Sequence, residues 1–147
     1  MNASLPVFES TLQKSNLWLK DLSTKIGSAS SQEAYQALRT VLHALRDRLT
    51  VDESAEFAAQ MPMLIRGMYF EGWNPGSEAT FERSREAFLG DVVDRFDGRW
   101  KDSPEQPVRT VFGFLSERIS AGEMRDVAHL LPKPVRNLWP EEIAHRR

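Results

Sequence analysis

The sequence repeats itself at a fixed offset, which carries Arg39 onto Arg109. Residues 37–70 and 107–140 align without a gap, and nine aligned positions are identical. The identical pairs are Arg39/Arg109, Thr40/Thr110, Val41/Val111, Leu45/Leu115, Arg48/Arg118, Glu53/Glu123, Ala58/Ala128, Pro62/Pro132 and Arg66/Arg136. Self-similarity at a fixed offset is typical of one structural unit used twice. The sequence therefore predicts a single domain over residues 1–147, made of repeat 1 (residues 8–77) and repeat 2 (residues 78–147).

Apolar residues in both repeats follow the three-four spacing of an α-helix, and no alternating strand pattern is present. The strongest stripes are Leu38, Val41, Leu42, Leu45 and Leu49 in repeat 1, and Val108, Val111, Phe112, Leu115 and Ile119 in repeat 2. The upstream stripes are Phe8, Leu12, Leu19, Leu22 and Ile26, and Phe81, Phe88, Leu89, Val92 and Phe96. These patterns predict an all-α fold.

Capping residues indicate where the helices begin. Four segments have the pattern of a capping box. In this motif the hydroxyl of the N-cap residue accepts from the backbone amide three positions later, and the side chain at that later position accepts from the backbone amide of the N-cap residue. The four segments are Ser30–Glu33, Thr50–Glu53, Ser103–Gln106 and Ser120–Glu123. Pro62 and Pro132 then open short fourth helices, ending near Tyr69 and Trp139. We expect two four-helix units, joined by a linker over 72–77 and packed about a pseudo-twofold axis.

Charge and composition exclude several classes of function. Net charge is −2: residues 1–77 carry 7 basic and 8 acidic residues, and residues 78–147 carry 12 basic and 13 acidic residues. Neither half has the excess of basic residues that is typical of a nucleic-acid-binding protein. No cysteine is present, which excludes disulfides and thiol catalysis. The first twenty residues lack a secretory leader, and the longest apolar run, 61–70, is too short for a membrane span. These features predict a cytoplasmic protein without a membrane partner.

The segment from Arg66 to Pro75 carries the best candidate binding residues. It combines a cation, a carboxylate, aromatics and two glycines within ten residues, at the junction of the repeats. Of the four candidates, Arg66 and Tyr69 have counterparts in repeat 2 and suit a supporting role, whereas Glu71 and Trp73 lie outside the aligned segment. The alternative is structural: the aromatic side chains anchor the linker in the groove between the repeats.

The remaining polar residues have structural explanations. Arginines recur at three repeat positions and could bind phosphate or an acidic partner, but ion pairs with helix acids, or contacts that cover helix ends, are the simpler reading. The acids considered are Asp47, Asp52, Glu56, Glu117 and Asp126. First-turn carboxylates such as Glu53 and Glu123 complement the helix dipole. His43, His129 and His145 do not recur at equivalent positions, so we expect no metal and no cofactor.

Nearly the whole chain resembles a known family. The segments AYQALRTVLHALRDRLTVDESAEFAAQMPMLIRGMYFEGWNP, RSREAFLGDV, ISAGEMRDVAHLLP and VRNLWP are similar to the prokaryotic domain-of-unknown-function family 2267. The resemblance implies a small, helical bacterial protein and supplies no catalytic residues.

The sequence contains no nucleophile elbow, phosphate-binding glycine loop or zinc motif. We therefore expect a non-catalytic interaction or regulatory module with an unknown protein partner, and homo-oligomerisation stays open. One alternative is a small-molecule binder or enzyme that uses the cleft between the repeats. A second is a nucleic-acid-associated protein, for which the short fourth helices offer apolar rather than base-reading side chains.

Overall fold

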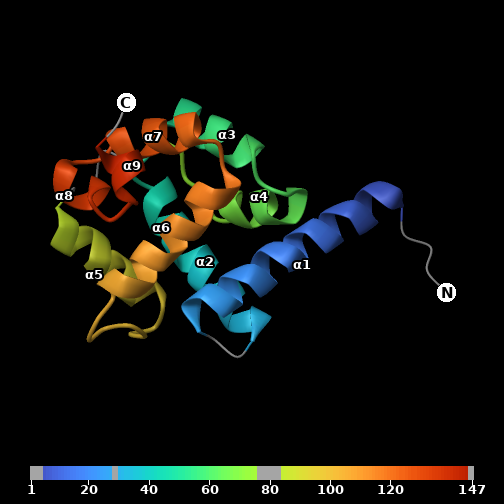
Figure 1. Ribbon diagram of the computed structural model, residues 1–147, viewed down its shortest axis with the longest axis horizontal. Coiled ribbons are helices and arrows are strands. Elements are labelled where there is room, and N and C mark those ends of the chain that lie inside the picture. Colours follow the sequence, from blue (N-terminus) through green and yellow to red (C-terminus); the bar gives the residue numbers. More distant parts are fainter. Residues whose placement is uncertain (1–4, 28–29, 76–83, 146–147) are drawn as a thin grey trace.

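The computed structural model describes residues 5–27, 30–75 and 84–145, and within these ranges the protein is entirely helical. The described ranges contain nine helices and no strand (Figure 1). They are α1 (Pro6–Ile26), α2 (Ser31–Arg46), α3 (Val51–Ala59), α4 (Met63–Phe70), α5 (Arg85–Arg95), α6 (Glu105–Arg118), α7 (Ala121–His129), α8 (Lys133–Arg136) and α9 (Glu141–Ala144). None of these helices is long and apolar enough to cross a membrane.

The helices α2 and α6 supply the centre of the hydrophobic core. The predicted stripes of both are confirmed: Leu38 to Leu49 and Val108 to Ile119 are at most 3% exposed at every stripe position. Around them, α1 contacts α6, α2 contacts α5, and α3 lies beside α7 (Figure 1). One cluster of buried side chains therefore includes residues from both halves of the chain.

Aromatic contacts connect helices that are far apart in the sequence. Trp18 of α1 meets Phe114 of α6 edge-on, with ring centroids 5.4 Å apart. Phe112 of α6 lies 6.0 Å from Phe88 of α5 and stacks on Trp139 at 3.7 Å. Because large aromatic side chains contribute much of the apolar burial in a core, these contacts hold α1, α5 and α6 together.

The predicted stripe of α1 is wrong in its first half. Phe8 and Leu12 are 56% and 52% exposed, whereas α1 buries Thr11, Ser15 and Trp18. Thr11 and Ser15 lie on the same side of α1 as Trp18 and Leu22, which are buried in the core. Burial of that side leaves Phe8 and Leu12 partly in solvent. The Leu64 amide at the start of α4, which has no side-chain cap of its own, donates to the Thr11 hydroxyl at 3.1 Å.

The caps agree with the sequence at three of the four predicted starts. Ser30, Thr50 and Ser120 accept from the amides of the glutamates three residues on, at 3.1–3.3 Å. The predicted cap at Ser103 is wrong: α6 begins after Pro104, and the Ser103 amide is held in the preceding turn by the carbonyl of Trp100.

Three further details differ from the sequence-based expectation. The amide of Ser120 donates to Oε1 of Gln60 at 2.8 Å, so Glu123 does not complete a capping box. The helix α8 ends at Arg136, before the predicted end near Trp139, and the amides of Leu138 and Trp139 instead close turns on the carbonyls three residues before them. A ninth helix follows Pro140. Phe81 and the end of the predicted linker, 76–77, lie outside the described residues.

Of the ion pairs that join the first half of the chain to the second, two are related by the repeat offset. Arg48 Nη1 donates to Asp91 Oδ2 at 2.8 Å, and Arg118 Nη2 donates to Asp21 Oδ2. The repeat offset relates the two arginines to each other, and it also relates the two aspartates. The Arg48 side chain is only 3% exposed, against 31% for Arg118, so the two pairs differ in their access to water.

Candidate functional site

The Arg66 side chain hydrogen-bonds to backbone carbonyls at the end of α3. Its Nε donates to the carbonyl of Ala58 at 3.2 Å and its Nη2 to the carbonyl of Met61 at 3.1 Å. Arg136, its counterpart in the second half, donates in the same way to the carbonyl of Leu131 at 3.2 Å. Carbonyls at a helix C-terminus lack partners within the helix. Both arginines therefore have a structural role in ending α3 and α7.

Tyr69 belongs to the core. Its side chain is 0% exposed, and its hydroxyl lies 2.8 Å from the Ser54 hydroxyl. Its ring meets Phe57 and Phe70 edge-on at 5.6 and 5.0 Å. Burial raises the pKa of Tyr69 above its ordinary value of 10.0. A neutral, enclosed phenol supports the α3–α4 pair rather than contacting a partner.

Glu71 and Trp73 lie nearer the surface, just after the end of α4. Glu71 Oε1 accepts from Arg39 Nη2 at 3.0 Å, and 61% of the Glu71 side chain is exposed. Trp73 is half-buried and packs its ring 5.0 Å from that of Phe70. Gly72 between them adopts a positive φ of 74°, which a side chain would strain. Of the four predicted residues, Tyr69 is buried, Trp73 is half-buried, and Arg66 and Glu71 are exposed.

Exposed apolar side chains gather near this segment and were not predicted. They come from the first half of α1 and the start of α4 and are 45–56% exposed. We call this group the α1–α4 apolar face; it comprises Leu5, Val7, Phe8, Leu12, Met63 and Leu64. A groove lined by Tyr35, Met63, Leu64 and Phe70 connects it to Glu71. The sequence signal was the position of Trp18 and Leu22, whose buried side of α1 includes Thr11 and leaves Phe8 and Leu12 exposed.

A second groove crosses between the two halves of the chain. Lys14, Leu17 and Trp18 of α1 line one side of it, and Glu117 and Arg118 of α6 line the other. It is the place that the small-molecule alternative would use. That alternative stays a prediction.

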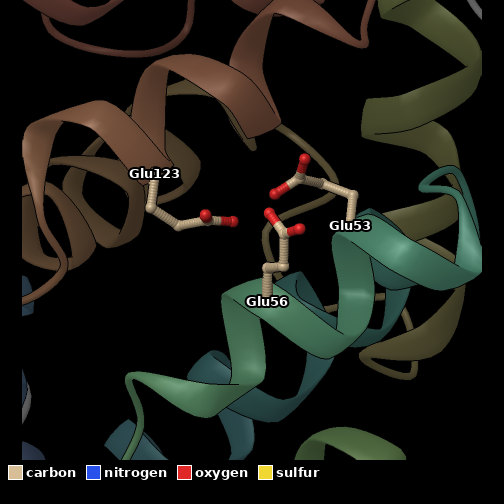
Figure 2. A group of neighbouring side chains, drawn as sticks. All are labelled: Glu53, Glu56 and Glu123. Atoms are coloured by element: carbon tan, nitrogen blue, oxygen red, sulfur yellow. The ribbon is translucent and has the colours of Figure 1, made fainter.

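Three glutamates converge where α3 meets α7 (Figure 2). Glu53 and Glu56 extend from α3 toward Glu123 of α7, and one carboxylate oxygen of each lies within 4.8 Å of the others. Glu123 is only 7% exposed. Burial, followed by the carboxyl of Glu53 beside it, raises the pKa of Glu123 to about 8. Sequence reasoning assigned these acids to helix dipoles one at a time and missed their convergence.

Four of the six retained arginines form ion pairs, but not with the acids that the sequence suggested. Arg39 contacts Glu71 and Arg109 contacts Glu105, in addition to the pairs of Arg48 and Arg118 between the two halves. His43 is buried with Nε2 2.7 Å from the carbonyl of Met68, and burial lowers the pKa of His43. None of the three histidines belongs to the glutamate cluster.

These features define a small all-helical protein with an exposed apolar face and a buried acidic junction. Residues 15–138 match the family described as "Uncharacterized conserved protein (DUF2267)", and the chain belongs to that family. No curated protein matches the chain.

Proposed function

We propose that this protein is a non-catalytic, cytoplasmic interaction module, and that the α1–α4 apolar face is its docking surface. The observation that carries the proposal is the exposure of Phe8 and Leu12 at 56% and 52% on a helix that buries threonine and serine. Contiguous exposed apolar patches on soluble proteins mark sites of interaction. The groove from Leu64 to Phe70 extends this surface to Glu71, with Trp73 packed behind it.

The occupant of the face is a second copy of the chain. Leu5, Phe8 and Leu12 are spaced by three and four residues, so they lie along one side of α1. An antiparallel pair of such helices places Leu5 of one copy near Leu12 of the other, with the two Phe8 rings adjacent at the centre. A twofold interface requires a patch that complements itself in this way. The charges on this part of α1, Glu9 and Lys14, balance each other and create no single-sign repulsion.

The fold that presents this face is a tandem duplication of four-helix units related by a pseudo-twofold axis. Three observations support this part of the proposal. The Arg48–Asp91 and Arg118–Asp21 pairs are reciprocal across the repeat offset. Arg66 and Arg136 end α3 and α7 through the carbonyls of Met61 and Leu131, which the same offset relates. The contacts of α1 with α6 and of α2 with α5 are also reciprocal.

The docking proposal is tested by the mass of the protein in solution. Sedimentation velocity and light scattering over about 1–200 μM should show concentration-dependent formation of a species of twice 16.8 kDa. Phe8→Glu should abolish that species, because it places a charge in the centre of the apolar contact. A wild-type protein that stays monomeric at every concentration would contradict the proposal.

Leu17→Glu is the matched control. Leu17 lies on the same helix and is equally exposed, at 56%. Its position in the sequence places it about 180° around the helix from Phe8. The control variant should therefore associate like the wild type. Equal loss of association in both variants would place the interface elsewhere and overturn the assignment of this face.

A further inference from the structure

The glutamate cluster lies at the junction of α3 and α7, whereas the exposed half of α1 extends from another part of the molecule (Figures 1 and 2). Glu53 is half-buried and Glu56 is exposed, and such acidic pairs are common on protein surfaces. The unusual member is Glu123. It comes from the other helix, is 7% exposed, points at the other two carboxylates, and has its Oε2 buried without a hydrogen-bond partner.

When these carboxylates are charged, no ion pair in the described part of the chain balances them. Among the described residues, none of the ion pairs includes Glu53, Glu56 or Glu123. The additional charge on α7 that affects Glu123 is another acid, Asp126. Oε2 of Glu53 is also buried and unpartnered. A buried carboxylate without a partner is costly, and buried charges in proteins are usually paired or bound to a metal.

The spacing of the oxygens suits one hard cation. They lie within 4.8 Å of one another. Calcium binds carboxylate oxygens at about 2.3–2.6 Å in flexible geometry, whereas magnesium demands near-ideal octahedral geometry and keeps several of its waters. Three carboxylates from two helices therefore suit calcium better than magnesium, and water can reach the ion past the exposed Glu56.

We propose that Glu53, Glu56 and Glu123 form a binding site for a calcium-sized divalent cation that joins α3 to α7. The inference goes beyond docking through α1, because the site uses none of the residues of the α1–α4 apolar face. The bound ion replaces repulsion between the carboxylates of the two helices with bonds to one shared metal. For three carboxylates on two helices, with one side open to water, we expect a dissociation constant for calcium of about 0.1–1 mM.

The test uses the full chain, freed of metal with EDTA and dialysed into 0.15 M NaCl at pH 7.5. Calorimetric titration with CaCl₂ should give one saturable site. Calcium at 10 mM should raise the melting temperature by about 3–6 °C, because a ligand that binds only the folded state stabilises it. MgCl₂ should give a smaller shift. Absence of both heat and shift with calcium would overturn the proposal.

Two variants locate the site, and a third controls for general charge effects. Glu56→Gln changes an exposed side chain, and Glu123→Gln is isosteric, so both should fold and bind calcium at least about tenfold more weakly. Asp52→Asn removes one charge from the same first turn of α3, outside the cluster, and should keep the full calcium shift. The same calcium shift in all three variants would show nonspecific binding and would also overturn the proposal.

Discussion

At the scale of single residues, equivalent positions in the two halves carry equivalent contacts in different surroundings. Arg48 donates both to Asp91 and to the carbonyl of Ala44, and its guanidinium lies over the Phe88 ring. Arg118 pairs with Asp21 and lies over the Phe114 ring, but its side chain is much more exposed. The same chemical pair thus occurs once inside the protein and once near water.

This difference predicts unequal effects of one substitution. Arg48→Met should lower the free energy of unfolding by about 2–3 kcal/mol, because it leaves a partly buried Asp91 with only Arg95 as its partner. Arg118→Met should lower it by less than about 1 kcal/mol, because water replaces the lost contact. Urea unfolding followed by circular dichroism measures both. Equal losses would contradict the difference in burial.

Residue types alone located some of these contacts and not others. The recurrence of Arg39, Arg48 and Arg66 indicated structural roles, which their partners bear out. Their acids could not be deduced, because Asp91 and Asp21 come from helices whose rotation is set by packing. Glu53 and Glu123 were recognisable as a recurring pair, but their proximity depends on how α3 lies against α7.

At the scale of helices, α1 shows that an apolar pattern can predict a helix without predicting which side is buried. The three-four spacing of Phe8, Leu12 and Leu19 predicted a buried stripe, and it correctly placed a long helix there. The side that faces the body instead carries Trp18 and Leu22, and Thr11 on that side accepts from the Leu64 amide at the start of α4. A pattern of hydropathy gives the helix, whereas its rotation depends on partners distant in the sequence.

Thr11→Val tests that account. The substitution keeps the shape of the side chain and removes the acceptor for the Leu64 amide, so the free energy of unfolding should fall by about 1 kcal/mol. Thr24→Val serves as the control, since the Thr24 hydroxyl is exposed and donates only to the Lys20 carbonyl of its own helix. Chemical denaturation of both variants gives the comparison. A Thr11→Val protein as stable as the wild type would show that the Thr11 hydroxyl does not stabilise the start of α4.

The α3–α7 junction should make stability depend on pH when no divalent cation is present. The pKa of Glu123 is about 8 in the folded protein against an ordinary 4.5, so the folded state holds a proton that the unfolded state releases. Stability should therefore fall as pH rises from about 4.5 to 8 and then level off. A loss of roughly 2 kcal/mol is expected, since a pKa unit corresponds to about 1.4 kcal/mol and water near Glu56 weakens the effect.

Glu123→Gln isolates this contribution. His43, whose pKa burial lowers, acts in the opposite direction: its contribution to stability is present above its ordinary pKa of 6.5 and is lost as pH falls. The difference between wild type and variant removes that background. Urea unfolding in EDTA from pH 5 to pH 8.5 should show the decline in the wild type only, and parallel curves would contradict it.

At the scale of the whole molecule, the two halves share one core. The buried cluster runs from Trp18 to Ala144 and includes the Trp18–Phe114 contact between them. The all-helical fold and the two central stripes could be predicted from the sequence, because burial follows hydropathy closely where helices are covered on all sides. The α1–α4 apolar face could not, because exposure there depends on where α1 runs past its neighbours.

A shared core predicts one unfolding transition. Tryptophan fluorescence reports on both halves, through Trp18 and Trp139, and circular dichroism reports on all helices. The two signals should change together in urea, with a single midpoint, as expected for a cooperative domain. Separate midpoints would show that one half unfolds before the other.

The crossed arginine–aspartate pairs bear on the history of such a chain. Under the proposed duplication, each bond runs from one copy to the other and none closes within a copy. A single-unit ancestor could have made both bonds only with another molecule of itself, as two identical contacts across a symmetric dimer. Gene fusion would then have freed the two contacts to diverge, and the burial of Arg48 beside the exposure of Arg118 records how far they have done so.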